Sequence, residues 1–177
     1  MLFKPMLLAG VMLIEPERRE DERGSFARAW CAREFAEHGI DVTWAQANVS
    51  HNRRRGTLRG LHFRRPPHGE AKLVRCTRGA IHDVLVDLRP EAPTFRAHMA
   101  VVLSAENALA LYVPKGLAHG FQTLEDDTDV FYLMSEFYAP EHETGVRWND
   151  PVLGIDWPPA EPRIVSTRDA TYPDLER

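Results

Sequence analysis

An all-β jelly roll or barrel is the fold class that the sequence predicts, and three observations predict it. Short apolar runs recur at a spacing of about 8–12 residues, as in β-sandwiches and barrels. Several runs alternate apolar and polar residues, as in 81-IHDVLVDL-88, which is the period-two pattern of a strand with one buried face. Turn-forming pairs such as Arg55-Gly56, Arg78-Gly79 and Arg89-Pro90 separate the runs. We expect residues 1–177 to form a single domain, large enough to bury a core without disulfide or metal.

The elements are expected in the following order. The apolar N-terminal segment does not fit a secretion signal, because Pro5 interrupts it and no small-residue cleavage site follows; a first strand starting near Val11 is expected instead. The later strands are expected at 25–30, 43–50, 57–63, 72–78, 80–88, 97–103, 109–114, 119–124 and 130–138. The best helical window is 31-CAREFAEHG-39, which Gly39 is expected to end. From about residue 148 the chain is rich in proline and tryptophan, and this tail is expected to wrap over the barrel.

Composition and charge exclude several classes of protein. Hydrophobic residues make up 44% and charged residues 27% of the chain, and the formal net charge is -4. Neither nucleic acid nor an anionic membrane surface is therefore an expected partner, and no apolar run reaches the roughly 18 residues of a membrane span. The two cysteines, Cys31 and Cys76, fit neither a disulfide framework nor a zinc site and are expected to be reduced in the cytoplasm.

Ionisable groups within two expected core strands point to a ligand site. The runs 57-TLRGLHF-63 and 114-PKGLAHGF-121 set arginine and histidine among apolar residues, and burying such groups is costly unless they are satisfied. No His-x-His pair occurs, and His62, His68 and Glu70 lack the paired spacing of metal ligands, so no metal is expected. Gly-x-Ser-x-Gly and phosphate-cradling glycine loops are also absent. General acid–base chemistry on an anionic substrate remains, with no metal or organic cofactor.

A series of motifs then makes the chain recognisable. They run through nearly its whole length, in the order 21-DERGSFAR-28, 46-QANVS-50, 57-TLRGLHF-63, 71-AKLVRCTRGAIHDVLVDLRP-90, 93-PTF-95, 103-LSAEN-107, 113-VPKGLAHGF-121, Tyr132, 138-YAP-140, 147-RWNDPVLGIDWP-158 and 166-STRD-169. With these motifs the chain resembles the dTDP-4-dehydrorhamnose 3,5-epimerase family. The resemblance implies a cupin-type double-stranded β-helix (a jelly-roll barrel) with a few short helices. It also implies a homodimer with N-terminal strands exchanged or packed across the interface.

The resemblance implies epimerisation of a nucleoside-diphosphate 4-keto-6-deoxyhexose, and it assigns four catalytic roles. His62 would abstract the proton α to the C4 ketone, and Asp169 would orient and stabilise the imidazole. Tyr132 would reprotonate the carbon from the opposite face, and Lys72 would stabilise the enolate oxygen. Three of these residues have a structural alternative: His62 as a satisfied barrel histidine, Tyr132 as a core tyrosine, and Asp169 as an exposed turn carboxylate.

The resemblance also implies residues that hold the substrate. Arg23, Arg59 and His119 match positions for the sugar and diphosphate, and an arginine fork suits phosphate oxygens. Gln46 and Asn48 share one strand face, and Tyr138, which has the same parity as Tyr132, could pack against the nucleotide base. His119 could instead be structural, and Arg53-Arg54-Arg55 is expected to be a solvated turn rather than a phosphate clamp.

Two local questions remain open from the sequence. Arg59 and His62 are an odd number of residues apart and would face opposite sides of a regular strand, so either Gly60 forms a bulge or Arg59 curls over the rim. The chain also departs from the family pattern, with Leu133 where many members have lysine and Arg64 where glutamine is frequent. Alternatives to the 3,5-epimerase are a single-carbon (C3 or C5) epimerase, a metal-dependent cupin oxygenase or isomerase, and a non-enzymatic sugar-nucleotide binding module.

Overall fold

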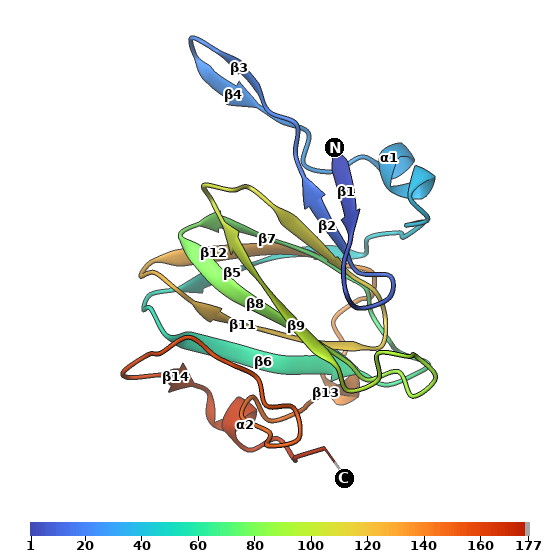
Figure 1. The fold of residues 1–177 in the computed structure, drawn as a ribbon, viewed down its shortest axis with the longest axis vertical. Coiled ribbons are helices and arrows are strands. Elements are labelled where there is room, and N and C mark those ends of the chain that lie inside the picture. Colours follow the sequence, from blue (N-terminus) through green and yellow to red (C-terminus); the bar gives the residue numbers. More distant parts are fainter. Residues whose placement is uncertain (176–177) are drawn as a thin grey trace.

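Two facing antiparallel sheets form the body of the molecule, and a computed structural model describes residues 1–175 (Figure 1). The first sheet has the strand order β1-β2-β10-β7-β12-β5, and the second has the order β13-β6-β11-β8-β9 with β14 paired to β6. The strands are β1 (Leu2–Pro5), β2 (Met12–Glu15), β3 (Arg19–Asp21), β4 (Gly24–Phe26), β5 (Gln46–Asn52), β6 (Thr57–Arg64), β7 (Lys72–Arg78), β8 (Ala80–Asp87), β9 (His98–Ser104), β10 (Ala110–Val113), β11 (Leu117–Thr123), β12 (Thr128–Met134), β13 (Glu143–Gly145) and β14 (Ile164–Val165). The helices are α1 (Ala32–Glu37), the 3-10 helix η1 (Pro140–His142) and α2 (Thr167–Ala170). The predicted jelly roll is confirmed.

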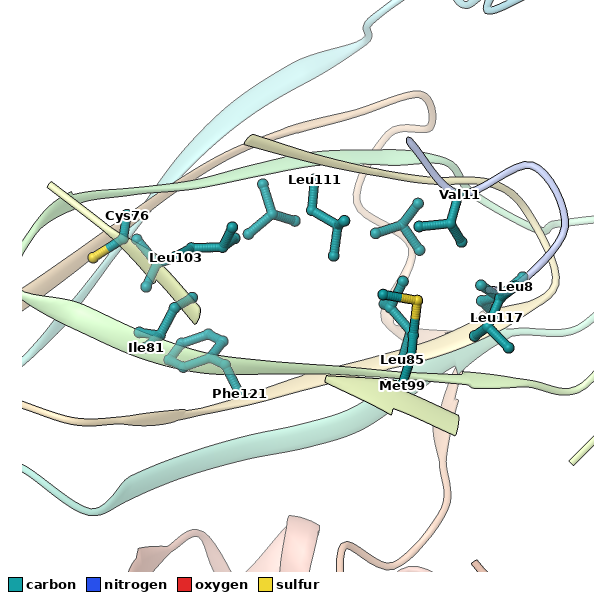
Figure 2. Close-up of a cluster of buried hydrophobic side chains, with 13 residues drawn as sticks. Leu8, Val11, Cys76, Ile81, Leu85, Met99, Leu103, Leu111, Leu117 and Phe121 are labelled. Atoms are coloured by element: carbon teal, nitrogen blue, oxygen red, sulfur yellow. The ribbon is translucent and has the colours of Figure 1, made fainter. Parts of the chain in front are cut away.

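The main core lies between the two sheets (Figure 2). Leu111 and Val74 point into it from the first sheet, and Leu85 and Phe121 point into it from the second. Because side chains alternate along a strand, the neighbouring Leu73 packs on the outer face of the first sheet, beneath Phe35 of α1. Each fully buried side chain of this size stabilises the fold by about 1.5–3 kcal/mol.

The C-terminal tail covers the outer face of the second sheet, as predicted. β14 pairs with β6 in parallel, α2 contacts β6, and β13 pairs with β6 in antiparallel register. Figure 1 shows this tail in orange and red along β6. Val146, Leu153 and Trp157 pack there against residues of β6 and β8.

The helix was predicted correctly, and its end shows why. α1 ends before Gly39, which has a φ of 76° and whose backbone N–H donates to the carbonyl of Ala36 at 3.0 Å. The next residue, Ile40, donates to the carbonyl of Phe35, which completes the turn. No helix among residues 1–175 is long and apolar enough to cross a membrane.

The N-terminal region differs from the prediction in two places. A strand, β1, precedes the expected first strand, because Pro5 lies at the end of a strand on the sheet edge, where a missing N–H is tolerated. The strand expected at 25–30 ends at Phe26, where it pairs with β3 in a hairpin that projects from the body (Figure 1). At the other end, β12 stops at Met134, so the strand expected at 130–138 is shorter than predicted.

Candidate active site

A cavity of about 310 Å³ opens between the two sheets and collects most of the predicted site residues. Its walls come from β5, β7 and β12 of the first sheet and from β6 and β11 of the second. The predicted residues that line it are Gln46, Asn48, Arg59, His62, Lys72, His119, Tyr132 and Tyr138. Asp169 lies behind His62, and only Arg23 is far from this group.

His62 and Asp169 form a hydrogen-bonded pair at the wall made by β6. The imidazole Nε2 lies 2.8 Å from Asp169 Oδ1, and the other carboxylate oxygen accepts the backbone N–H of Gly60 at 3.0 Å. In this arrangement Nε2 carries the proton and donates it, so Nδ1 keeps a lone pair. Burial alone would raise the pKa of Asp169, but the hydrogen bonds from His62 and Gly60 outweigh it and hold the pKa below its ordinary value. The carboxylate is therefore a stable anion beside the imidazole.

The motif 166-STRD-169 explains how a residue so late in the chain reaches His62. Ser166 caps α2, and its Oγ accepts the backbone N–H of Asp169 at 3.0 Å. The two-residue strand β14 brings the cap to β6, because Val165 lies in register with Leu58. Asp169, with 4% of its surface exposed, is thus fixed by both its backbone and its side chain. The alternative of an exposed turn carboxylate is excluded.

A bulge at Gly60 settles the orientation of Arg59. His119 of β11 faces His62, and Phe121 faces Arg59, so two steps on β11 match three steps on β6. The extra residue in β6 realigns the side chains, and Arg59 and His62 both line the cavity. Arg59 Nε donates to Asn52 Oδ1 at 2.8 Å, which holds the guanidinium at the cavity.

Tyr132 lies on the wall opposite His62. It belongs to β12 in the first sheet, whereas His62 belongs to β6 in the second. Burial raises the pKa of the Tyr132 phenol, and the positive charge of Arg59 partly offsets this effect. The phenol is therefore protonated at neutral pH, as a proton donor must be.

Lys72 and His119 add charged and polar groups to the two walls. Lys72 Nζ lies 3.1 Å from Glu70 Oε1, and both residues are at most 9% exposed. His119 Nε2 lies 2.7 Å from Oδ1 of the fully buried Asp83. The cavity thus contains a second histidine whose ring is oriented by a carboxylate.

The remaining predicted residues lie at the cavity's edge. Gln46 and Asn48 occupy alternate positions of β5, and their side-chain amides make long contacts with the sulfur of Met134 at 3.6 and 3.4 Å. Tyr138 follows the end of β12 and is 66% exposed. Both amides and the tyrosine ring can contact a bound molecule.

Arg23 does not reach the cavity within one chain. It lies in the turn between β3 and β4, its side chain is 85% exposed, and it pairs with Asp21 at 2.6 Å. Of the two departures from the family pattern, Leu133 packs on the outer face of the first sheet, away from the cavity. Arg64 is buried next to the cavity wall and pairs with Glu70.

Sequence reasoning missed three acidic residues of the site. Asp83 lies on one strand face with Leu85 by the alternation in 80–88, but the pattern alone does not distinguish cavity from solvent for it. Glu70 and Lys72 are two residues apart and were a readable signal for a pair on one side of the chain. Glu143 lines the cavity from the short strand β13, and no sequence pattern indicated it. Among residues 1–175, no group of three or more histidine, cysteine or acidic side chains is arranged to hold a metal ion.

Comparisons with known proteins match the whole fold. A sequence model of a family described as dTDP-4-dehydrorhamnose 3,5-epimerase matches residues 5–177. A dTDP-4-dehydrorhamnose 3,5-epimerase of Sinorhizobium fredii is 42% identical, over 99% of this chain and 90% of the relative. A dTDP-4-dehydrorhamnose 3-epimerase of Streptomyces niveus is also 42% identical, over 96% of this chain and 81% of the relative. The crystal structure of a dTDP-4-dehydrorhamnose 3,5-epimerase from Bacillus anthracis, with TDP and PPi bound, superposes with a TM-score of 0.94 at 40% identity, over 98% of this chain and 100% of that one.

Proposed function

Because the chain belongs to the dTDP-4-dehydrorhamnose 3,5-epimerase family, we propose that its cavity divides the steps of epimerisation among four side chains. The chain is a carbohydrate epimerase, and its substrate is a nucleoside-diphosphate 4-keto-6-deoxyhexose of the dTDP-4-dehydro-6-deoxyglucose type, inverted at C3 and C5. One observation carries the assignment of roles: His62 and Tyr132 stand on facing sheets with the cavity between them. A base and an acid on opposite sides are what inversion of a carbon requires.

The reaction at each carbon begins with proton abstraction. Nδ1 of His62 takes the proton α to the C4 ketone, and the electron pair of the broken C–H bond moves into the enolate. Asp169, already an anion, stabilises the imidazolium through the 2.8 Å contact. The Lys72 ammonium stabilises the negative charge that develops on the C4 oxygen.

Reprotonation completes the inversion. Tyr132 donates its proton to the carbon from the opposite face, and the enolate electron pair forms the new C–H bond. Burial raises the pKa of the phenol and keeps it protonated until the strongly basic carbanion-like centre takes the proton, and the phenol then recovers a proton from solvent. The His62 proton is lost to solvent as well, so each inverted carbon carries a solvent hydrogen.

The cavity's polar groups would hold the rest of the substrate. Arg59 and His119 supply donors for the sugar and diphosphate, and Gln46 and Asn48 supply amides from the other sheet. Tyr138, at the rim, offers an exposed ring for the nucleotide base. The TDP bound by the Bacillus anthracis relative supports a thymidine nucleotide.

A single-carbon epimerase is the second candidate. The Streptomyces niveus relative, a 3-epimerase, is as similar to this chain as the 3,5-epimerase of Sinorhizobium fredii is. The same acid–base set could serve one carbon or two, depending on whether the bound intermediate reorients in the cavity so that its second carbon lies between the base and the acid. The number of carbons that exchange hydrogen with solvent separates the two functions.

We also propose that the chain is a single-domain homodimer in the cytoplasm. The family's substrate position at Arg23 lies on a hairpin that projects away from its own cavity, so a second copy is the natural recipient of this arginine (Figure 1). Cys31 and Cys76 are both free, as is usual for thiols in a reducing compartment.

Heavy-water exchange tests the proposed function and its base together. We expect the unaltered enzyme, given dTDP-4-dehydro-6-deoxyglucose in heavy water, to place deuterium at both C3 and C5. His62→Asn should lower the exchange rate by about 10²- to 10⁴-fold, the usual contribution of a general base, with little change in dTDP affinity.

His51→Asn is the matched control, because His51 also contacts an aspartate, Asp129, at 2.7 Å but lies outside the cavity. It should exchange at the unaltered rate. Deuterium at one carbon alone would establish the single-carbon epimerase. A His62→Asn enzyme that exchanges as fast as the unaltered one would refute His62 as the base.

A further inference from the structure

Three ionic side chains next to Lys72, those of Arg64, Glu70 and Glu143, have no part in the roles assigned above. Arg64, only 3% exposed, places its Nε 3.0 Å from Glu70 Oε2. The other oxygen of Glu70 lies 3.1 Å from Lys72 Nζ. Arg64 Nη2 also lies 3.7 Å from Glu143 Oε1. One buried arginine thus connects two carboxylates and, through one of them, the lysine that faces the reacting oxygen.

The two carboxylates carry negative charge that the site must compensate, and Arg64 compensates chiefly that of Glu70. Glu70 and Glu143 both line a cavity that must accept a diphosphate and an enolate, and each would repel these anions. Arg168 pairs with Glu143, with its Nη2 3.1 Å from Oε2. Lys72 can neutralise only part of the Glu70 charge while it also stabilises the enolate. Arg64 does not line the main cavity but supplies a positive charge from behind it. The substrate therefore meets Lys72 without meeting two uncompensated carboxylates.

The geometry also shows how Arg64 can act on Lys72. Glu70 bridges the two cations with one carboxylate oxygen to each. When Arg64 fixes the position of Oε2, it also fixes the position of Oε1, which contacts Lys72. The N–H bonds of Arg64 Nε and Nη2 do not align with a hydrogen-bond acceptor, so the attraction to Glu70 is chiefly Coulombic. The remaining nitrogen, Nη1, donates to the carbonyl of Phe137 at 3.0 Å and anchors the guanidinium.

We propose that Arg64 is a positioning residue that acts through Glu70 to hold the Lys72 ammonium at the site of the developing oxyanion. This inference rests on the proposed function, since it assigns a partner to Lys72 in that reaction. Arg64 is also the departure from the family pattern that touches the site, whereas Leu133 does not. The Arg64–Glu70–Lys72 array is therefore a feature of this chain that affects the rate of epimerisation through the position of Lys72.

A double-mutant cycle on turnover tests the proposal. The kcat and KM of the folded enzyme on dTDP-4-dehydro-6-deoxyglucose are measured for R64Q, E70Q and R64Q/E70Q. R64Q should lower kcat about 10- to 100-fold, as expected when a catalytic group is misplaced, with KM changed less than about threefold. E70Q should also lower kcat, and adding R64Q to E70Q should lower it little further, because Arg64 acts through the group already removed.

The control is R65Q, which removes an arginine charge from the next position along the chain, just after the end of β6. Arg65 is exposed, so R65Q should keep the unaltered kcat and KM. Thermal unfolding of every variant separates loss of folded protein from loss of rate. If R64Q does not fold, the comparison of E70Q with the charge-balanced R64Q/E70Q carries the test alone.

Three results would overturn the proposal. The first is an R64Q enzyme with unaltered kcat. The second is a loss in R64Q/E70Q equal to the product of the two single losses, which would show that Arg64 acts independently of Glu70. The third is a rise in KM alone, which would place the effect of Arg64 in the Phe137–Tyr138 segment that it anchors. An unaltered enzyme without turnover would instead refute the proposed function, and this inference with it.

Discussion

At the scale of single residues, His62 and His51 each contact an aspartate at almost the same distance in very different surroundings. The contacts are 2.8 Å to Asp169 and 2.7 Å to Asp129, but the Asp169 side chain is 6% exposed and that of Asp129 is 27% exposed. Water screens the Asp129 contact, whereas Asp169 acts in a medium of lower polarity. The same pair of residue types is therefore a surface contact in one place and a candidate catalytic dyad in the other.

The substitution Asp169→Asn tests the dyad by both rate and pH. We expect kcat to fall by about 10²- to 10⁴-fold, because the amide cannot stabilise the imidazolium and can hold the ring in the wrong tautomer. The pKa of Asp169 is lower in the folded state, so the carboxylate stabilises the protein above its unfolded pKa of about 3.9. This stabilisation is lost as the pH falls through the lowered value. Urea unfolding should show a gap between the two proteins at pH 7 that shrinks below about pH 4.

Asp129→Asn is the matched control for this experiment. Asp129 contacts His51 at 2.7 Å but is partly exposed, and no residue of that pair lines the cavity. We expect unaltered kcat and a change in stability below about 1 kcal/mol. A gap for Asp169→Asn that is constant from pH 7 to pH 2 would contradict the assigned ionisation.

At the scale of elements, β6 carries most of the site, and its bulge lets it do so. Gly60 has a φ of 120°, and a Cβ there would lie 2.5 Å from Gly120 Cα and 2.8 Å from the carbonyl oxygen of His119. The two glycines allow β6 and β11 to approach closely where the register shifts. The same bulge presents the Gly60 N–H to Asp169. Gly60 thus affects the register of β6 and β11, the docking of the C-terminal tail through Asp169, and the geometry of the catalytic residues.

The substitution Gly60→Ala should therefore cost more than backbone strain alone. Gly24 has nearly the same φ, 126°, but a Cβ there would have no atom within 4 Å. Backbone strain of about 1–3 kcal/mol is common to both substitutions, and crowding adds about 1–3 kcal/mol at Gly60 only. Urea unfolding of G60A and G24A should show this difference. Equal losses in the free energy of unfolding would mean that β11 moves away at no cost. The close approach of β6 and β11 would then not contribute to the effect of Gly60→Ala.

These elements also show where sequence prediction succeeds and where it stops. Alternation along 80–88 predicted β8 because the period of two is a local pattern, although the strand is buried on both faces, and Gly39 predicted the end of α1 because a helix end is also local. The choice between a bulge and a rim position for Arg59 depended on pairing with β11, which is not local. Glu143 and the strand β1 were missed because their surroundings are set by distant segments. The family resemblance, rather than periodicity, connected His62 with Asp169.

At the scale of the whole molecule, the β3–β4 hairpin extends away from the body of the chain (Figure 1). It carries the exposed Arg23 in its turn and Phe26, which is 71% exposed, at its base opposite Arg19. A large exposed apolar side chain on a projecting hairpin is suited to burial against another chain. If Arg23 binds substrate, it must do so in the cavity of a partner, because its own cavity contains no part of the hairpin.

Mixing two inactive enzymes tests this arrangement. R23A lacks the arginine, and H62N lacks the base. If Arg23 acts across a dimer, a mixed dimer has one cavity in which His62 of the R23A chain meets Arg23 of the H62N chain, and that cavity is intact. Random exchange makes about half of the dimers mixed, each with one intact cavity of two, so deuterium exchange should recover to roughly a quarter of the unaltered rate. Mixing H62N with Asp169→Asn is the control, because each chain then lacks part of its own dyad and no cavity is restored. If Arg23 acted within its own chain, every cavity of the R23A and H62N mixture would also keep one defect, and mixing would recover nothing.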